Sequence, residues 1–242
     1  MASRIYERAS VYLEGHRAEP KQIFVEIADR LEALNKPKLR LLDVGCAAGE
    51  FPEYAQRRFE NAAVTGVDID QSLIDAARER VPAASFCTAD ANDLHMFEDG
   101  SFDAVTMTGV HSIFDDFRTS FSECIRVCVA SGTVIISGLF NDYPIDMLAY
   151  WRYANNFDGD FSRGYNVFSK ESVSTFLSRQ VRVESFKFEK FVLPFDLEPQ
   201  EDRVRSWTEI NGDGDRIFRN GLMELNFQIL VTDIAGARND ES

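Results

Sequence analysis

Basic residues are scarce in this sequence. Its 242 residues include 26 Lys and Arg against 40 Asp and Glu, so the formal net charge is −14 at pH 7, and the pI is near 4.7. Neutralisation of phosphates by Lys and Arg supplies most of the non-specific affinity for nucleic acids. The charge balance therefore argues against a nucleic-acid substrate.

Long apolar runs are missing as well. No stretch of about 18 apolar residues occurs, so the sequence predicts no transmembrane helix. The segment from Met1 to Arg8 carries charged side chains and has no apolar centre, which is atypical of a secretory signal peptide. We expect a cytoplasmic protein that does not bind membranes.

Cysteine and histidine are few and scattered. Cys124 and Cys128 are one helical turn apart, but no further Cys or His stands near them in the sequence to complete a zinc site. We expect no metal centre and interpret the four cysteines as small buried thiols in a reducing compartment.

The most informative stretch that is present runs from residue 40 to residue 59. Arg40 to Val44 is a short apolar run typical of a buried parallel strand. Gly45, Ala47 and Gly49 follow in a turn with little side-chain bulk, and the next residues begin a helix with Pro52 in its first turn. A strand, a small-residue turn and a helix N-terminus together let a ligand lie against backbone amides.

The spacing indicates which ligand binds there. A dinucleotide-binding G-x-G-x-x-G pattern would need glycine at position 50, where the sequence has Glu50. The pattern D-x-G-x-A-x-G from Asp43 to Gly49 instead resembles the first motif of the class I S-adenosylmethionine-dependent methyltransferases. Ala47 departs from the commoner middle glycine of that motif.

The resemblance implies a set of cofactor contacts. It implies that the loop with Gly45, Cys46, Ala47 and Gly49 cradles the methionine moiety of S-adenosyl-L-methionine and that Asp43 faces the cofactor's amino group.

Later strand ends carry further acidic residues. Asp68 follows Gly49 by 19 residues, at the end of a second apolar strand, where an acid can accept hydrogen bonds from both ribose hydroxyls. Asp70 fits the N-cap of the next helix. The resemblance implies that Asp90 and the amide of Ala91 contact the adenine. The remaining expected cofactor-binding residues are Ile69 and Thr108.

The order of elements predicts the fold. We expect an α/β, Rossmann-like, doubly wound sheet of seven strands in the order 3-2-1-4-5-7-6, with an antiparallel last strand. The expected single domain spans 1–242, with an N-terminal helical region (1–37), a cofactor-binding core (38–138), and a substrate-side segment with an antiparallel strand pair (139–242). Residues 115–131 are predicted to form a helix closed by Gly132, and residues 193–221 an extended loop with turns, one of them at Asn211 to Gly214.

The predicted function is methyl transfer from S-adenosyl-L-methionine to a small polar molecule, by O-methylation of a sugar or related metabolite. The acceptor is expected near 109–114, 140–153, 6–16 and 203–207, because these segments are rich in aromatic and hydrogen-bonding side chains. His111 is the candidate general base, since an unperturbed imidazole can accept an alcohol proton at cellular pH.

Other functions stay open at this stage. They are carboxylate methylation or N-methylation of a small molecule, a cofactor-binding protein without transfer activity, and a nicotinamide oxidoreductase, which Glu50 disfavours. Neither the acceptor nor the oligomeric state follows from the sequence.

Overall fold

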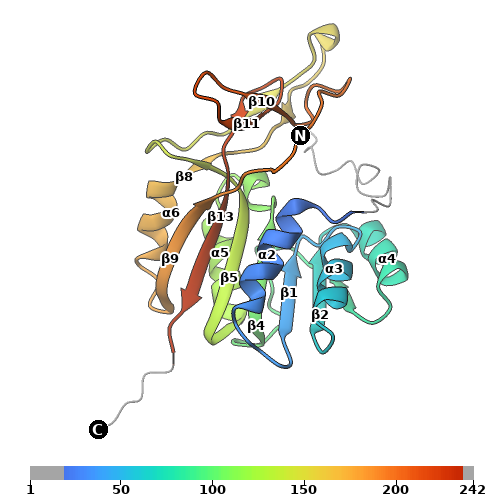
Figure 1. Ribbon diagram of the computed structural model, residues 1–242, viewed down its shortest axis with the longest axis vertical. Helices are drawn as coiled ribbons and strands as arrows, with labels where there is room; N and C mark the ends of the chain where they lie inside the picture. Colours follow the sequence, from blue (N-terminus) through green and yellow to red (C-terminus); the bar gives the residue numbers. More distant parts are fainter. Residues whose placement is uncertain (1–18, 237–242) are drawn as a thin grey trace.

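A large central sheet organises the protein (Figure 1). The computed structural model describes residues 19–236. Within them the main sheet runs in the order β3 (Ser85–Thr88), β2 (Ala63–Asp68), β1 (Arg40–Val44), β4 (Phe102–Thr108), β5 (Cys128–Asn141), β13 (Phe227–Ile234) and β9 (Val183–Lys190). The first five strands along this path are parallel, and β13 is antiparallel to both its neighbours. The predicted order 3-2-1-4-5-7-6 is confirmed.

One strand lies outside that path. The short β8 (Phe168–Ser169) pairs in parallel with the end of β5, at Phe140 and Asn141, so the described sheet has eight strands. The sequence analysis expected only seven. A strand of two residues is too short to show a period-two pattern, so the sequence could not predict it.

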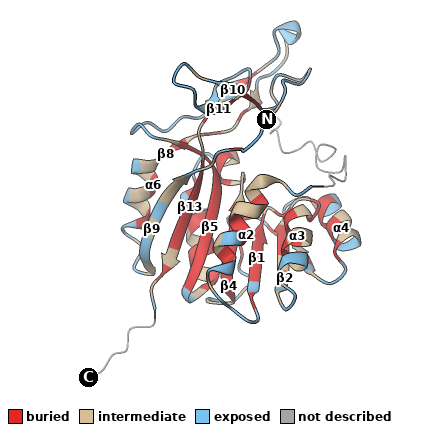
Figure 2. Cartoon of the chain, in the orientation of Figure 1, coloured by how far each residue is buried: buried red, intermediate tan, exposed pale blue. Residues whose placement is uncertain are grey.

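Helices cover both faces of the sheet. The α-helices among the described residues are α2 (Gln22–Glu32), α3 (Glu50–Arg58), α4 (Gln71–Arg80), α5 (Arg118–Val127) and α6 (Lys170–Leu177). Leu41 packs with α2 and α3 on one face, whereas Leu42 packs with α5 and α6 on the other. Alternate side chains of a strand point to opposite faces, so β1 is buried on both sides (Figure 2).

The end of α5 differs from the prediction. The helix stops at Val127, and Cys128 already pairs with Phe102 of β4. The pairing resumes at Ala104 with Thr133, so the intervening residues of β5 form an irregularity in the ladder, in which Ser131 has a φ of 58°. The predicted helix end at Gly132 is wrong because strand pairing begins four residues earlier than this glycine.

A smaller layer lies over the carboxyl ends of the parallel strands (Figure 1). It contains the antiparallel sheet β10 (Trp207–Ile210), β11 (Arg216–Arg219) and β12 (Glu224–Leu225), and the hairpin β6 (Tyr150–Trp151) and β7 (Ser162–Arg163). We call this layer, residues 142–167 and 193–226, the cap. The predicted turn at Asn211 to Gly214 is present, but the rest of the prediction for 193–221 is wrong, because β10 and β11 pair as a hairpin on either side of this turn.

The cap is attached to the sheet by apolar contacts. Leu139 at the end of β5 packs with Leu193, Phe218 and Leu225, and Phe227 of β13 joins them. These contacts hold the cap above the edge of the sheet at which the ligand is expected.

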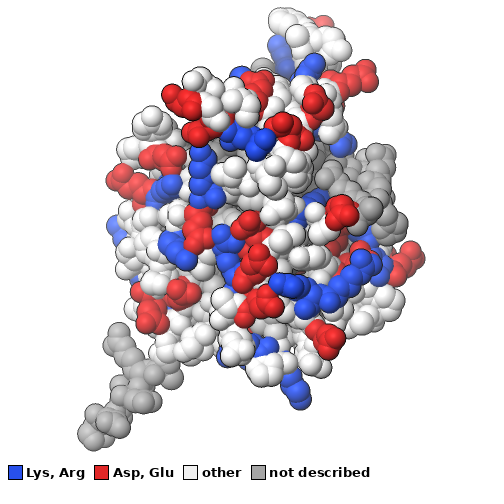
Figure 3. All heavy atoms as spheres, in the orientation of Figure 1, with Lys and Arg blue, Asp and Glu red and all other residues white. Residues whose placement is uncertain are grey.

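Two surface properties complete the description. Acidic and basic side chains are interspersed on the face drawn in Figure 3. None of the helices between residues 19 and 236 combines the length and the apolar character that crossing a bilayer requires.

The core between α5 and the sheet should be sensitive to truncation. Phe121 of α5 is 0% exposed and contacts the rings of Phe117, Phe176 and His111. We expect Phe121→Ala to lower the free energy of unfolding by about 3–5 kcal/mol, because a large cavity replaces the ring. Urea denaturation measures the change. Phe157→Ala is the control, since Phe157 is 72% exposed, and a change there above about 1 kcal/mol would contradict the assignment of the core.

Candidate active site

A cavity of about 410 Å³ opens at the carboxyl ends of the parallel strands. It lies between the loops after β1 and β4, where the strand order reverses, which is the usual ligand position in open α/β sheets. A second cavity of about 120 Å³ shares Gly45, Ala47 and Thr108 with the first. The two cavities therefore adjoin at the loop after β1.

The loop after β1 brings backbone close to the cavity. Gly45 has a φ of 76°, and a Cβ added there would lie 2.2 Å from Cγ2 of Val110, so only glycine fits without a shift of the neighbouring side chain. Ala47 has a φ of 46°, a left-handed conformation that costs an L-residue about 1–2 kcal/mol. Position 47 therefore has the geometry for which the commoner glycine is suited. Gly49, with a φ of 80°, precedes α3 directly.

Cys46 is buried under this loop. It packs beside Ile74, Ala77 and Phe86 and lines only the smaller cavity. Burial raises the pKa of its thiol. All four cysteines are free, as the sequence predicted, and no cluster of potential metal ligands occurs among residues 19–236.

Asp43 is buried at the end of β1 and lines the smaller cavity. Its Oδ1 accepts a hydrogen bond of 2.8 Å from the hydroxyl of Thr106. Burial, with a smaller contribution from the charge of Asp68, raises the pKa of Asp43 to about 7. A cation placed in the smaller cavity would favour the ionised carboxylate.

Asp68 and Asp70 both line the large cavity but make different contacts within the protein. Asp68 accepts hydrogen bonds from the amides of Ala47 (2.9 Å) and Asp70 (3.0 Å). Burial raises its pKa, and these donors oppose that shift. Asp68 lines the large cavity with lone pairs left to accept from a ligand. The Asp70 carboxylate caps α4 by accepting from the amides of Ser72 and Leu73, which confirms the predicted N-cap.

The neighbouring strand end provides the rest of this part of the cavity. Ile69, Asp90 and Ala91 all line it. Ile69 is 55% exposed, an apolar side chain open to the space where a flat ring could lie. The Asp90 carboxylate is exposed and accepts from the amide of Asn92 at 2.9 Å. We call the part of the cavity lined by Gly45, Ala47, Asp68, Ile69, Asp90 and Ala91 the cofactor end.

Thr108 lies between the cofactor end and the rest of the cavity. Its hydroxyl oxygen is buried and has no hydrogen-bond partner among the described residues. Since buried hydroxyls are normally paired, this oxygen is positioned to bond a polar group of a ligand. Every predicted cofactor-binding residue except Gly49 thus lines one of two cavities that share part of their lining, with Asp43 and Cys46 on the smaller one.

The other end of the cavity reaches under the cap. We call it the acceptor end; its lining residues are Ile113, Phe114, Leu139, Tyr165, Ser206, Leu225 and Phe227. Leu225 and Phe227 belong to strands that end the chain and carried no sequence signal for a site. Residues 6–16, which were expected near the acceptor, lie outside the described residues.

The aromatic segment after β5 does not form the expected wall. Within 140–153, no residue lines the large cavity, and Tyr150 and Tyr153 are exposed. The nearby rings of Phe157 and Phe161 each contact the guanidinium of Arg152 at 4.7 Å. They stabilise the projecting hairpin instead of facing a ligand.

Asn166 is a site residue that the sequence analysis missed. Its buried side chain donates from Nδ2 to the carbonyl of Phe114 (2.7 Å) and accepts from the amide of Ala149 (3.0 Å). Its own amide donates to the carbonyl of Ser112 at 2.6 Å. Asn166 therefore fixes the loop after β4 against the cap, although a lone Asn in the sequence gives no such signal.

His111 lies beneath the cavity and not in it. It is 0% exposed, and its ring stacks on Phe140 at 4.7 Å. Nε2 donates to the carbonyl of Leu139 at 3.1 Å, which leaves Nδ1 as the unprotonated nitrogen. Burial lowers the pKa of His111 to about 4. The general-base role stays a prediction, but in this arrangement the imidazole cannot reach an acceptor.

Comparisons with known proteins agree with this geometry. A family model described as "Methyltransferase domain" matches residues 42–136. A demethylmenaquinone methyltransferase of Thermotoga maritima is 29% identical over 167 residues, which cover 65% of this chain and 72% of that protein. One from Thermus thermophilus is 32% identical over 43% of this chain, and the match spans about half of that protein (49%).

A solved structure supports the fold. The YcgJ protein of Bacillus subtilis superposes with a TM-score of 0.58 at 18% identity, covering 86% of this chain and 97% of that one. Residues 42–136 match a methyltransferase domain, and the chain is similar in sequence to S-adenosylmethionine-dependent methyltransferases. It is an enzyme whose cofactor is S-adenosyl-L-methionine, and Thr108, Asp68 and the loop after β1 fit that group.

Asp43 should give the protein a distinctive pH dependence. With its folded-state pKa raised from 3.8 to about 7, the folded protein binds the proton more tightly than the unfolded chain, so stability falls as pH rises from about 4 to 7. Asp43→Asn keeps the acceptor oxygen for Thr106 and removes this decline. We expect the variant to be more stable at pH 8, by about 2–4 kcal/mol, since one pKa unit corresponds to about 1.4 kcal/mol.

The same substitution should weaken cofactor binding. If Asp43 faces the cofactor's ammonium group, Asp43→Asn lowers affinity for S-adenosylhomocysteine at pH 8 by at least about tenfold. Wild-type affinity should rise between pH 6 and 8 and that of the variant should not. Calorimetric titrations across this range test both points, and a pH-independent wild-type affinity would contradict the ammonium contact.

Asp68 and Asp70 form a matched pair for a second test. We expect Asp68→Ala to lower cofactor affinity by at least about tenfold, because the ribose hydroxyls lose a charged acceptor. Asp70→Ala should cost about 1 kcal/mol of stability through the lost cap and leave affinity nearly unchanged. Calorimetry with S-adenosylhomocysteine and thermal melts separate the two effects. Loss of affinity in the Asp70 variant alone would show that the ribose contact is assigned to the wrong acid.

Proposed function

We propose that this methyltransferase acts on a small acceptor whose reacting part is a largely apolar ring bearing an acidic hydroxyl. The lining of the acceptor end carries the proposal: five of its seven residues, Ile113, Phe114, Leu139, Leu225 and Phe227, are apolar. An apolar wall with a few polar groups at fixed positions is typical of sites for apolar small molecules. The remaining two, Tyr165 and Ser206, provide hydroxyls that could orient the ring.

The cofactor is proposed to bind across the strand ends. The methionine moiety would lie against the loop from Gly45 to Gly49 with its amino group towards Asp43, and Asp68 would accept from the ribose. Asp90 and Ala91 would contact the adenine, and Ile69 would cover one face of the ring. This placement directs the reactive end of the cofactor past Thr108, towards the acceptor end.

The bound cofactor supplies an activated methyl group. The remaining task of the protein is alignment, which can contribute about 7–11 kcal/mol, together with exclusion of water. The cofactor would supply its methyl group to the acceptor oxygen, and the proton of the hydroxyl would pass to water. Asn166 and the cap contacts of Leu139 hold the wall against which the acceptor would be aligned.

The acceptor proton decides between acceptor classes. Of the described residues at the acceptor end, only Tyr165 carries an ionisable group, and the pKa of the buried His111 is about 4. A phenol or quinol is more acidic than a sugar hydroxyl, so its methylation depends less on a base in the transition state. The site therefore favours an acidic ring hydroxyl over the sugar expected from the aromatic segment.

The relatives support the same direction. Two of them carry the name demethylmenaquinone methyltransferase, which supports a quinone-type ring as the acceptor and adds methylation at a ring carbon as an alternative to methylation of the hydroxyl. A sugar, a carboxylate or an amine acceptor, and cofactor binding without transfer, are the alternatives that the following experiment separates.

Methyl-labelled S-adenosyl-L-methionine should be incubated with the protein and a panel of 1,4-naphthohydroquinone, simple phenols, aromatic carboxylates, amines and monosaccharides. We expect label in ring hydroxyl compounds and none in the monosaccharides. Label in a monosaccharide alone would overturn the proposed class, and cofactor binding without any product over a broad panel would favour the non-transferring alternative.

Phe114→Ala tests the acceptor end itself. Loss of an aromatic wall should raise the acceptor KM by about tenfold and leave affinity for S-adenosylhomocysteine unchanged. Phe161→Ala is the matched control, because Phe161 lies on the projecting hairpin outside the cavity. If Phe161→Ala raises the acceptor KM more than Phe114→Ala does, the acceptor binds at the aromatic segment and not at the acceptor end of the cavity.

A further inference from the structure

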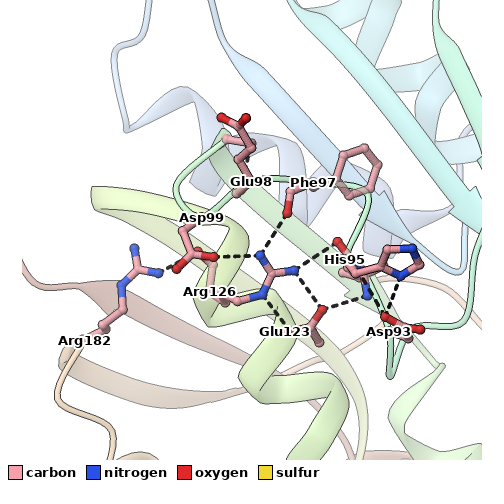
Figure 4. Close-up of polar contacts among 10 residues, drawn as sticks. Asp93, His95, Phe97, Glu98, Asp99, Glu123, Arg126 and Arg182 are labelled. Atoms are coloured by element: carbon pink, nitrogen blue, oxygen red, sulfur yellow. Dashed lines mark hydrogen bonds and ion pairs between the residues drawn. The ribbon is translucent and has the colours of Figure 1, made fainter.

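The loop between β3 and β4 carries Asp90 and Ala91 into the cofactor end of the cavity and then continues beside α5. Leu94 in this loop is 0% exposed, and the loop returns to the sheet at Phe102. Its position over this distance is set by a polar network from α5, drawn in Figure 4. We call Glu123 and Arg126 the α5 clamp.

The α5 clamp bonds the loop at several points. Arg126 donates to the carbonyls of Leu94 (3.0 Å) and Phe97 (2.9 Å) and to the carboxylate of Asp99 (2.8 Å). Glu123 accepts from the amide of Leu94 at 2.7 Å. Both backbone polar groups of Leu94 are therefore bonded by the same pair of side chains.

The pair is itself fixed. Nε and Nη2 of Arg126 donate to the two carboxylate oxygens of Glu123 at 2.7 and 2.8 Å, a bidentate arrangement that sets the plane of the guanidinium. The bond to Arg126 is the main cause that lowers the pKa of Glu123, so the carboxylate is charged at neutral pH. A lysine would supply the charge without this planar fork.

The clamped residue directly follows the turn that faces the cofactor. The amide of Asp93 donates to the carbonyl of Asp90 at 2.8 Å, and Asp90 in turn accepts from the amide of Asn92. Asp90 and Asp93 pair as an isolated bridge, so the turn is tight. Because this turn is tight, a displacement of Leu94 also displaces Asp90 and Ala91.

We propose that Arg126 is a positioning residue for adenine recognition: by fixing Leu94, Phe97 and Asp99, it places the Asp90 turn at the distance that reads the adenine amine. Arg126 does not line the cavity and touches no ligand. The inference rests on the proposed assignment of Asp90 to the adenine, and the experiment below tests the two separately.

The readout is selectivity between two probes, S-adenosylhomocysteine and S-inosylhomocysteine, measured by calorimetry on the full chain. The second probe replaces the adenine amine by a carbonyl, which a carboxylate cannot bond. The wild type should prefer the first probe by at least about tenfold, as expected for one charged hydrogen bond. Arg126→Met and Arg126→Lys should each reduce this ratio to below about threefold.

Arg182→Met is the matched control. Arg182 also donates two hydrogen bonds to backbone carbonyls at the end of α5, to those of Arg126 and Cys128, but bonds no residue of the loop from Leu94 to Asp99 among the described contacts. This variant should keep the wild-type ratio even where its melting temperature falls. All titrations are made well below the melting temperature of each variant, and Arg126→Lys serves if Arg126→Met does not fold.

Each outcome decides one point. Asp90→Asn should abolish the preference, and its failure to do so would overturn the adenine assignment itself. Loss of the preference in Asp90→Asn with a wild-type ratio in both Arg126 variants would overturn only the role of Arg126. If Arg182→Met loses the preference for S-adenosylhomocysteine to the same extent, the cause is a general destabilisation near α5. That result would also overturn the inference.

Discussion

The carboxylate of Asp68 joins the two loops on which the cofactor end of the cavity depends. One oxygen accepts from the amide of Ala47 in the loop after β1, and the other accepts from the amide of Asp70 in the turn after β2. The amide belongs to a residue with a left-handed φ of 46°. Without the Asp68 carboxylate, no single side chain would bond both the amide of Ala47 and the amide of Asp70.

This interaction has an electrostatic consequence. Burial raises the pKa of Asp68, and the two amides offset part of that shift. Asp43, which lacks comparable backbone donors, has a pKa of about 7 under the added influence of Asp68. The two acids at adjacent strand ends thus differ in the hydrogen bonds that oppose the effect of burial, and a cationic ligand group beside Asp43 would favour its charged form. Ligand binding and protonation are linked at this position.

The cofactor half of the protein could be predicted from the sequence because its signals are local. Arg40–Val44 and Phe102–Thr108 are apolar strands buried on both faces, and their ends place Asp43 and Thr108 directly. The acid after the second strand follows the first loop by a nearly constant spacing. Asp70 at the N-cap of α4 was equally readable, since capping depends on neighbouring residues only.

The cap could not be predicted in the same way. Its strands are short, and β10 has two buried residues followed by two exposed ones, so no period-two pattern identifies it. The aromatic residues of 140–153 indicated a ligand wall by composition, but none of them lines the large cavity, and the rings of Phe157 and Phe161 lie against Arg152. Composition gives no information about which side of a hairpin faces the sheet.

The two ends of the cavity therefore differ in how they are built. The cofactor end consists of consecutive strand ends within residues 43–108, whereas the acceptor end combines Phe114, Leu139, Tyr165 and Phe227 from distant parts of the chain. The bonds from Asn166 to Phe114 and Ala149 join these parts. The residues that define the acceptor end are not among those that define the cofactor end. Substitutions in the cap can therefore change which acceptor fits without disturbing cofactor binding. The cofactor could be predicted because its residues follow one another closely in the sequence. The acceptor has to be inferred from the shape and the apolar lining of the folded cavity, because its residues come from distant segments.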